Sequence, residues 1–442
     1  MEPDVLLIVC DSLRKDIMQI YGGEAKTPNL LKLGEDAVVY ENAIAPSPWT
    51  FPSHVSLFTG LYLNEHKVHE TEKDKLLDLT KFNLDLKAER LAEYLSNKGY
   101  NTLGISNNPM VSTQTAFDIG FQNFFMIDPF PVSKEDPVFQ EARRLGASPK
   151  EIALKLIKQG KFKKILEFAK LRKREKLISE VINFPLDKGA ELTNKLLLNG
   201  NWESKFFRFI NFLEVHEPYR NYNSKEVWDN VTGIKPMSQN SIKNIRKEYI
   251  AEMEYLDNQI GKLISTLKKA GKYDNTMIII TSDHGQAINE HGYMLHSTYL
   301  YDELTRIPMI IKYPNSKKFE KKKGYQNLVY IPKLIKDVLE EGDDSAIYSE
   351  TTFSEAYGAV IVLPGGYKDR EEYVKKKYEK LRKAVYKDGF KLTVNGTDGT
   401  IEEFLEGEKE IKVEENKEKA KELLEELEIF KGKEEFIIPK IN

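Results

Sequence analysis

Residues 4–10 read DVLLIVC, and Asp11 follows directly. This continuous apolar run, rich in β-branched side chains, is the pattern of a strand buried on both faces of a sheet. Such strands belong mainly to parallel sheets that have helices above and below them. The stretch therefore predicts a buried strand of an α/β domain, with Asp11 at its carboxyl end.

Three later segments repeat this pattern, and helix-like segments lie between them. The apolar runs are FFRFINFL (206–213), TMIIITS (276–282) and IPMIIK (307–312). Residues 86–99 and 247–271 carry apolar side chains with a helical period, and a glycine ends each of these segments. Strands that alternate with helices predict an α/β fold, a three-layer α/β/α sandwich around a mostly parallel sheet.

Polar side chains follow three of the predicted strands. Asp11 follows the first, Glu214 and His216 follow the second, and Asp283 and His284 follow the third. In open parallel sheets, binding sites form beyond the carboxyl ends of the strands. We therefore expect these side chains to meet at one edge of the sheet.

The composition describes a large folded chain. Its 442 residues are 40% hydrophobic and 31% charged, and the formal net charge of −3 gives no indication of a nucleic-acid partner. The single cysteine, Cys10, excludes a disulfide framework within the chain and indicates a reducing compartment. The first apolar run is too short for a signal peptide, and no segment approaches the roughly 20 apolar residues of a membrane span. We therefore expect a cytoplasmic protein.

Two regions depart from the alternating pattern. Residues 133–200 read as a helical, lysine-rich insertion, with 13 Lys and Arg against 4 Glu between 140 and 177. This insertion is either a solvated set of helices or a lid or docking surface for an anionic substrate or a membrane. Residues 402–428 carry 12 Glu against 5 Lys. We expect a catalytic domain over 1–345 and a small C-terminal strand-and-helix subdomain over 346–442.

The Asp283-His284-Gly285 turn is a candidate metal site. Its carboxylate and imidazole can bind one ion together with Asp11, which supplies a second carboxylate. The alternative is structural, with a polar turn at 283–285 and a helix cap at Asp11. All seven histidines lie near this turn, near Thr50 or in a loop after a predicted strand. They are His54, His66, His69, His216, His284, His291 and His296.

The stretch SPWTFPSHVSLFTG (47–60) is either an ordinary helix entry or a mount for a nucleophile. A hydroxyl such as that of Thr50 is a poor nucleophile near neutrality, but coordination to a metal lowers its pKa. The N–H groups at the start of the following helix favour an anion. Pro48 and Pro52 restrict the turn that holds Thr50 in place.

Ordered blocks over most of the chain resemble the sulfatase family of the alkaline phosphatase superfamily. They include VLLIVCDSLRKD, TPNLLKLGEDAVVYENAIAPSPWTFPSHVSLFTGLY, LAEYLSNKGYNTLGISNNP, DIGFQNF, LEVHEPY, YIAEMEYLDNQIGKLI, TSDHGQAINEHG and LHSTYLYDELTRIPMIIKY, and KAVYKDGFKLTVNG resembles the family's short C-terminal strands. The insertion at 133–200 has no counterpart in this resemblance.

The departures from the family pattern indicate a branch with a threonine nucleophile. Sulfatases carry C-x-P-S-R or S-x-P-x-R, whose first residue is oxidised to formylglycine, whereas this chain has Thr50-Phe51-Pro52-Ser53-His54. Threonine cannot become formylglycine. The Asp283-His284 pair replaces the Asp-Asn of calcium-binding sulfatases, and His296 replaces a lysine. These changes resemble the relatives that cut or transfer phosphoesters.

The resemblance implies a role for each matching residue. The implied ligands of one divalent cation (Mn, Zn, Mg or Ca) are Asp11, Thr50, Asp283 and His284. The implied catalytic residues are Thr50, His216 and His296, and the implied substrate-binding residues are Asn108, His54 and Arg14. Glu214 is a candidate to orient His216, while His66, His69 and His291 are expected to pack within loops.

The resemblance implies a metal-dependent hydrolase of phosphate mono- or diesters with Thr50 as nucleophile. The alternatives are a sulfuric ester hydrolase without formylglycine, a phosphoryl-group transferase and a non-catalytic binding domain. The substrate would be a small-molecule, lipid or sugar ester. We expect no nucleic-acid partner and no membrane span, with peripheral membrane contact through the basic insertion as an option.

Overall fold

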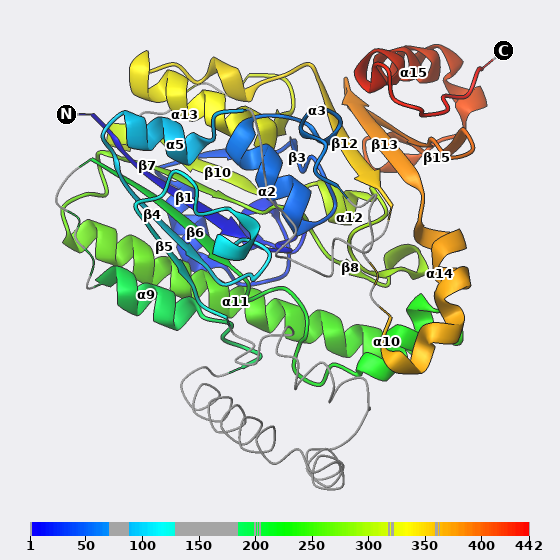
Figure 1. Cartoon of the computed structure of the whole chain (residues 1–442), viewed down its shortest axis with the longest axis horizontal. Coiled ribbons are helices and arrows are strands. Elements are labelled where there is room, and N and C mark those ends of the chain that lie inside the picture. The colour runs from blue at the N-terminus through cyan, green and yellow to red at the C-terminus, as the bar shows by residue number, and fades with distance from the viewer. Residues whose placement is uncertain are drawn as a thin grey trace, which may run out of the picture.

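The computed structural model describes residues 2–69, 88–128, 184–198, 200, 202, 205–316, 319, 322–358, 361 and 363–441. A seven-stranded sheet with the order β2-β10-β7-β1-β6-β4-β5 forms the centre of the molecule (Figure 1). Its strands are β1 (Asp4–Cys10), β2 (Val38–Tyr40), β4 (Asn101–Ser106), β5 (Asn123–Met126), β6 (Phe206–Phe212), β7 (Thr276–Thr281) and β10 (Met309–Lys312).

The strand that opens the chain lies in the middle of this sheet. β1 pairs in parallel with both β6 and β7, and β4 and β5 extend the parallel part. β10, predicted from the run at 307–312, is antiparallel to β7 and to β2. The segment between β7 and β10, which contains β8, β9 and α12, brings the chain back beside β7 from the end at which β7 finished, so β10 runs in the opposite direction.

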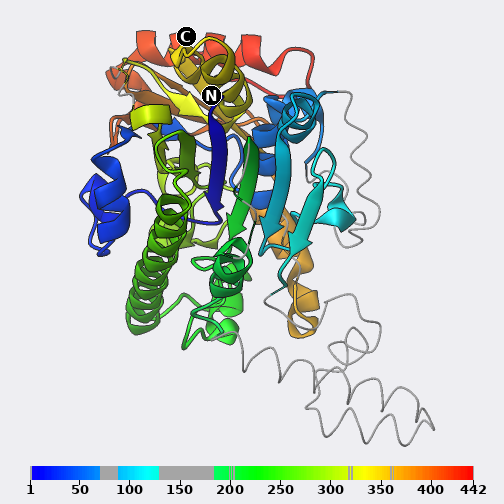
Figure 2. The ribbon, with the colours of Figure 1, turned by 90° about the vertical axis from the view of Figure 1, so that its left-hand side faces the viewer.

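Helices cover both faces of the sheet, as the apolar pattern of β1 requires. Leu6 and Ile8 face one core, while Leu7 and Val9 face the other, since side chains alternate along a strand. The first core includes residues of α1 (Pro28–Gly34), α9 (Ala190–Leu198) and α11 (Gln239–Lys269). The second includes residues of α2 (Thr50–Thr59), α5 (Leu91–Asn97) and α13 (Ile331–Glu340). The two layers are visible on either side of the strands in Figure 2.

The long helix α11 begins earlier than its periodic pattern predicts. The apolar period indicates a helix from residue 247, but α11 starts at Gln239. Ser238 caps it, because its Oγ accepts the N–H of Ser241 at 3.2 Å.

No helix in the described part of the chain combines the length and apolarity that a membrane span needs.

A separate antiparallel sheet follows near the C-terminus. It consists of β12 (Thr351–Tyr357), β13 (Leu381–Lys387), β14 (Phe390–Asn395), β15 (Thr400–Glu406) and β16 (Lys409–Glu410), with α15 (Lys417–Lys431) packed on it. Buried Lys383 links Glu355 of this sheet to Glu434 of the tail. Shorter elements are β3 (Ala43–Ile44), α3 (Leu63–His66), α10 (Ser224–Val231), β8 (Ala287–Ile288), β9 (Met294–Leu295), α12 (Asp302–Thr305), β11 (Gln326–Asn327) and α14 (Glu371–Tyr378).

The predicted α/β fold with a three-layer sandwich and a small C-terminal strand-and-helix unit is confirmed. The domain boundary at residue 345 stays a prediction. Most of the predicted basic insertion at 133–200, from its start to residue 183, lies outside the described residues.

Candidate active site

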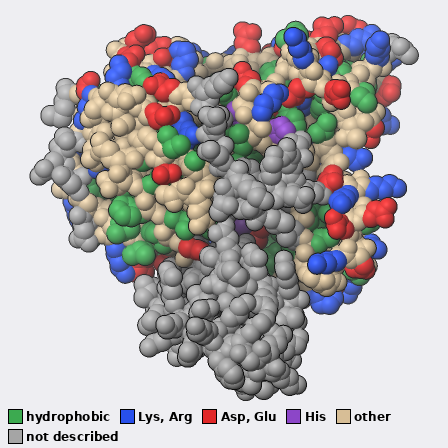
Figure 3. Space-filling model, in the orientation of Figure 1, with side chains coloured by type: hydrophobic (Ala, Val, Ile, Leu, Met, Phe, Trp, Pro, Cys, Tyr) green, Lys and Arg blue, Asp and Glu red, His purple; other side chains and the backbone are tan. Residues whose placement is uncertain are grey.

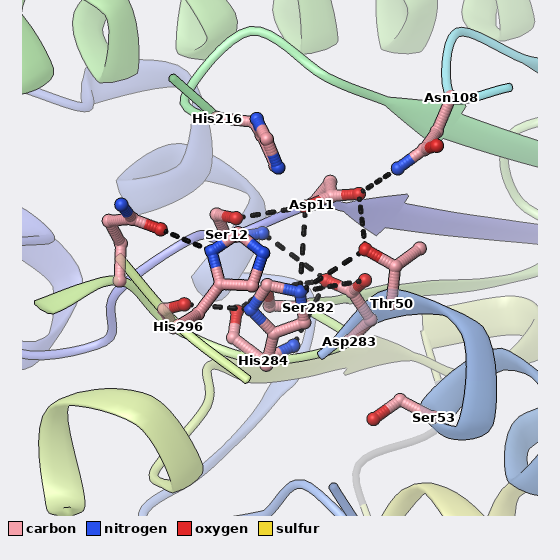
Figure 4. A network of polar contacts seen from close by, with 12 residues as sticks. Asp11, Ser12, Thr50, Ser53, Asn108, His216, Ser282, Asp283, His284 and His296 are labelled. Atoms are coloured by element: carbon pink, nitrogen blue, oxygen red, sulfur yellow. Dashed lines mark hydrogen bonds and ion pairs between the residues drawn. The ribbon is translucent and has the colours of Figure 1, made fainter. Parts of the chain in front are cut away.

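Two strand ends place two carboxylates and an imidazole side by side. Asp11 follows β1, while Asp283 and His284 follow β7, its parallel neighbour. One potential ligand atom from each residue lies within 4.8 Å of those of the other two. His284 Nε2 lies 3.7 Å from Asp11 Oδ1 and 3.4 Å from Asp283 Oδ2, and all three side chains are fully buried (Figure 4). These residues are three of the four predicted metal ligands.

The bonding of this cluster leaves ligand atoms available to a cation. Asp283 Oδ1 accepts the N–H of Ser12, whose φ is +63°, and the N–H of His284. Asp283 Oδ2 is buried and has no hydrogen-bond partner among the described residues. His284 Nδ1 donates to the Gly285 carbonyl at 2.7 Å, which leaves Nε2 for a ligand bond. Burial and the charge of Asp11 raise the pKa of Asp283 well above its ordinary value. The residues therefore fit one divalent cation.

Asp11 is the carboxylate that keeps its charge. Its Oδ2 accepts Asn108 Nδ2 at 2.6 Å and Thr50 Oγ1 at 3.2 Å, and its Oδ1 accepts Ser12 Oγ at 2.9 Å. Burial opposes ionisation, but the three imidazoles of the site and the Asn108 amide lower the pKa of Asp11 below its ordinary value. Asn108 can still offer the second hydrogen of its amide nitrogen to a substrate.

Thr50 is the first residue of α2 and points its hydroxyl into the cluster. Its Oγ1 lies 3.3 Å from His284 Nε2 as well as 3.2 Å from Asp11 Oδ2, and the residue is 3% exposed. The preceding residue, Trp49, has an extended backbone, so Thr50 is the first residue in helical conformation. Free N–H groups in the first turn of this ten-residue helix favour an anion beside Thr50. The stretch at 47–60 is thus a helix entry that also places a hydroxyl at the cluster.

His54, implied as a substrate-binding residue, has partners for both ring nitrogens. Nδ1 donates to the Thr50 carbonyl at 2.9 Å, so Nε2 accepts from Asn211 Nδ2 at 3.2 Å. Burial lowers the pKa of His54 to about 4, which keeps the ring neutral at pH 7. Its contacts support a role in holding the start of α2 in place rather than a role in binding substrate. Asn211, which the sequence reasoning missed, carried no signal beyond its place near the end of a strand.

Arg14, also implied as a substrate-binding residue, is engaged within the protein. Its guanidinium pairs with Asp16 at 2.7 Å and with Glu290 at 2.5 Å, and it donates to the Gln286 carbonyl at 3.1 Å. These contacts, made by a side chain that is 4% exposed, hold the loop after Asp11 against the loop after His284. Arg14 thus supports the site from within the protein, and its part in substrate binding stays a prediction.

His216 and His296 come together beside the cluster, as predicted. The ring centroid of His296 lies 4.5 Å from that of His284 and 5.1 Å from that of His216. Glu217, which the sequence reasoning missed, lies with its Oε2 3.7 Å from His216 Nδ1 and 4.0 Å from His296 Nδ1. The sequence feature that could have indicated Glu217 is its position directly after His216. Although burial opposes the charged form, Glu217 and Asp11 raise the pKa of His216, whereas burial lowers that of His296 to about 3.

Glu214 does not orient His216, contrary to that hypothesis. Its carboxylate accepts the backbone N–H groups of Lys188, Ala190 and Leu213 at 2.9–3.2 Å. Burial raises the pKa of Glu214 to about 7. The side chain joins the end of β6 to the start of α9, because its oxygens meet the free N–H groups there.

The other histidines contact neighbouring side chains, as expected of loop-packing residues. The contacts are His66 with Ser56 Oγ at 3.1 Å, His69 stacked on Tyr357 and His291 stacked on Tyr301. Cys10 is fully buried in the core. In Figure 3, histidine side chains are visible near the centre of the face shown, while charged side chains of both signs lie around its rim.

The chain is similar to known proteins over most of its length. Residues 3–340 match the Sulfatase family model. Human iduronate 2-sulfatase is 23% identical over 353 residues, which cover 70% of this chain and 60% of the relative, so the chain spans about three fifths of that protein. The structure of a phosphonate monoester hydrolase of Agrobacterium radiobacter is similar, with 17% sequence identity and a TM-score of 0.62. The match covers 97% of this chain and 94% of the hydrolase chain.

A 2-O GAG sulfatase has the same fold, with 15% identity, a TM-score of 0.65 and coverage of 97% of this chain and 91% of its own. The match to the family model extends from β1 through α13, and so includes every residue of the cluster. The chain therefore belongs to the sulfatase family.

Proposed function

We propose that this protein is a metal-dependent hydrolase of phosphate mono- or diesters in which Thr50 is the nucleophile. The observation that carries the proposal is the position of Thr50 Oγ1, 3.2 Å from Asp11 and 3.3 Å from His284 at the start of α2. Asp11, Asp283 and His284 would hold one divalent cation, with Thr50 as the fourth ligand. Their mixed oxygen and nitrogen donors suit Mn or Zn.

The cation would lower the pKa of the hydroxyl and offset negative charge on the transferring group. Thr50 Oγ1 would attack phosphorus, forming an Oγ1–P bond while the bond to the leaving oxygen breaks. The hydroxyl proton would leave through Asp11 Oδ2, which already accepts its hydrogen bond. Water would then attack phosphorus and give a proton to the deprotonated His216, while the Oγ1–P bond breaks and the proton held at Asp11 returns to the Thr50 oxygen. The products are an alcohol and a phosphate with one ester bond fewer.

The two histidines would act on the leaving group and the transferring oxygens. Each Nδ1 donates to a carbonyl oxygen of the protein, so Nε2 is the nitrogen left for substrate. The raised pKa of His216 suits a proton donor to the leaving oxygen, and neutral His296 suits a positioning contact. Asn108 Nδ2 and the N–H groups of the first turn of α2 would bind non-bridging oxygens.

Sulfuric ester hydrolysis is the second candidate, because the relatives named above include sulfatases. Threonine makes it less favourable, since formylglycine hydrate can expel sulfate by elimination and a threonine ester cannot. Transfer of the phosphoryl group to an acceptor alcohol would use the same geometry, with the alcohol in place of water. We further propose a cytoplasmic location, a lipid or sugar ester as substrate and peripheral membrane contact through the basic insertion at 133–200.

Paired aryl phosphate, phosphodiester, phosphonate and sulfate esters, assayed at one fixed Mn²⁺ concentration, test the proposal. We expect the highest kcat/KM with a phosphorus ester, and a phosphoryl adduct on the peptide that contains Thr50 after acid quenching. A sulfate ester as the best substrate would favour the second candidate. Absence of turnover with all four classes, together with metal-free purified protein, would instead indicate a binding domain.

A further inference from the structure

Behind the site, hydrogen bonds link His296 to Gln286 and Gln286 to the Glu217 carboxylate, and His216 bonds to the backbone of the same Glu217. His216 Nδ1 donates to the backbone carbonyl of Glu217 at 2.7 Å, and His296 Nδ1 donates to Gln286 Oε1 at 2.8 Å. Gln286 Nε2 in turn donates to Glu217 Oε2 at 3.1 Å. The bridge connects the loop after β6 to the loops after β7 and β9. Glu217 and Gln286, which it joins, are 69 residues apart in sequence.

Each group in the bridge has one arrangement of hydrogens that satisfies it. Carbonyl oxygens only accept, so both Nδ1 atoms must carry hydrogen. A carboxylate also only accepts, so the amide of Gln286 must turn its NH₂ toward Glu217 and its oxygen toward His296. Both imidazoles are thereby held with Nδ1–H on the bridge and with Nε2 as the remaining nitrogen.

The bridge is itself fixed by the turn that carries the metal ligands. Gln286 is fully buried, lies two residues after His284, and its carbonyl accepts the Arg14 guanidinium. His296 lies between two residues with left-handed backbone, Leu295 at φ +78° and Ser297 at φ +97°.

Such conformations are unfavourable for residues other than glycine, so the surroundings must impose them. The N–H of Ser297 donates to the Pro48 carbonyl at 2.9 Å, which connects this loop to the turn that holds Thr50.

We infer that Glu217 and Gln286 are positioning residues that set the tautomer and ring orientation of His296 for the transfer reaction. His216 is held separately, because its Nδ1 donates to the backbone carbonyl of Glu217. Without the carboxylate–amide pair, the His296 ring could flip about χ2 or change tautomer, so that a carbon or the wrong nitrogen would face the substrate. This inference rests on the proposed function only for the effect on turnover.

Substitutions at the bridge separate its parts. Glu217→Ala and Gln286→Ala remove the pair and should each lower kcat by about 10- to 100-fold with little change in KM, the usual scale for residues that orient a ligand imidazole. Glu217→Gln keeps an acceptor oxygen for Gln286 Nε2 and should lose less than Glu217→Ala. Glu248→Ala is the matched control, because this glutamate on α11 contacts Asn221 and not a histidine.

Two readouts distinguish positioning from other roles. Proteins with ¹⁵N-labelled histidine should show an Nδ1–H tautomer for His296 in the wild type and mixed tautomers in Gln286→Ala, with the signal assigned through His296→Asn. The His216 signal, assigned through His216→Asn, should stay the same, because its Nδ1 donates to a backbone carbonyl that the substitution does not remove. Metal content by plasma mass spectrometry should be the same in the wild type and the bridge variants. This NMR result does not depend on turnover, so it stands even if no ester is cleaved.

Unchanged tautomers and unchanged kcat in both alanine variants would overturn the inference. So would the loss of a metal equivalent in Glu217→Ala, because Glu217 would then be a ligand, with His216 and His296, of a second ion.

Discussion

Asp283→Asn removes one charge from the metal cluster with almost no change of shape. Asp283 Oδ1 accepts two backbone N–H groups, from Ser12 at 3.2 Å and from His284 at 3.0 Å, and an asparagine oxygen can accept both. Oδ2 has no hydrogen-bond partner among the described residues, so an amide nitrogen in its place displaces no bond. We therefore expect the fold around the cluster to survive the change.

The charges predict opposite effects on stability with and without metal. Carboxylate oxygens of Asp11 and Asp283 lie within 4.8 Å of each other. Two unit charges at that distance repel by about 3.5 kcal/mol at an effective dielectric constant of about 20. Partial protonation of Asp283 relieves some of this cost, because burial and Asp11 raise its pKa. The metal-free variant should therefore be more stable than the metal-free wild type by about 1–3 kcal/mol.

Metal should reverse this order. A cation that binds only the folded wild type stabilises it by about 4 kcal/mol at 1,000 times its Kd, and the variant should gain little. The metal-free gap should also widen as pH rises. A raised pKa means that the folded wild type holds its proton more tightly than the unfolded chain does, and therefore loses stability as pH rises through that pKa.

Urea unfolding in EDTA and in excess Mn²⁺, with metal analysis of each protein, measures these differences. Asp4→Asn is the matched control, since Asp4 lies at the other end of β1, where its Oδ1 accepts the N–H of Phe206 at 2.9 Å. The control should respond to Mn²⁺ as the wild type does. The reasoning is refuted if Asp283→Asn is destabilised equally in both conditions, or if it retains the wild-type metal content.

Three further predictions follow from single contacts. Thr50→Ala should lower kcat at least 1,000-fold because it removes the nucleophile, while Thr50→Ser should keep appreciable activity; equal activity in all three proteins would exclude covalent catalysis. Gly285→Ala should destabilise the fold by about 2–3 kcal/mol in urea unfolding, because a Cβ there would lie 2.0 Å from the Glu303 carbonyl oxygen; an unchanged midpoint would contradict this. Glu434→Gln should lower Tm at pH 7, and the difference should shrink as pH falls from 4.5 toward 2. Although burial opposes it, bonds to two lysines lower the pKa of Glu434 to about 2, so its contribution is present above the unfolded pKa and is lost on acidification. A difference that stays constant with pH would assign the loss to packing instead.

The sequence by itself determined the fold class and the place of the candidate metal cluster. A strand buried on both faces must be apolar throughout, so DVLLIVC and TMIIITS could be recognised without a structure. Because β1 and β7 are parallel neighbours, the polar residues after them had to meet at one edge. For Asp11, Asp283 and His284, local position in the chain was therefore enough. The strand pattern also predicted His216 at that edge, and the ordered blocks added His296 and the role of Thr50 as nucleophile through resemblance.

Only the tertiary structure decided what the loop side chains contact. Arg14 was implied to bind substrate, yet it pairs with Asp16 and Glu290, and nothing in its local sequence indicates Glu290 as a partner. Glu214 and Glu217 are three residues apart on one loop, but one joins β6 to α9 and the other lies beside both histidines. The physical reason is that strand periodicity sets which face a side chain takes. In a loop, its direction depends on backbone turns and on partners supplied by distant segments.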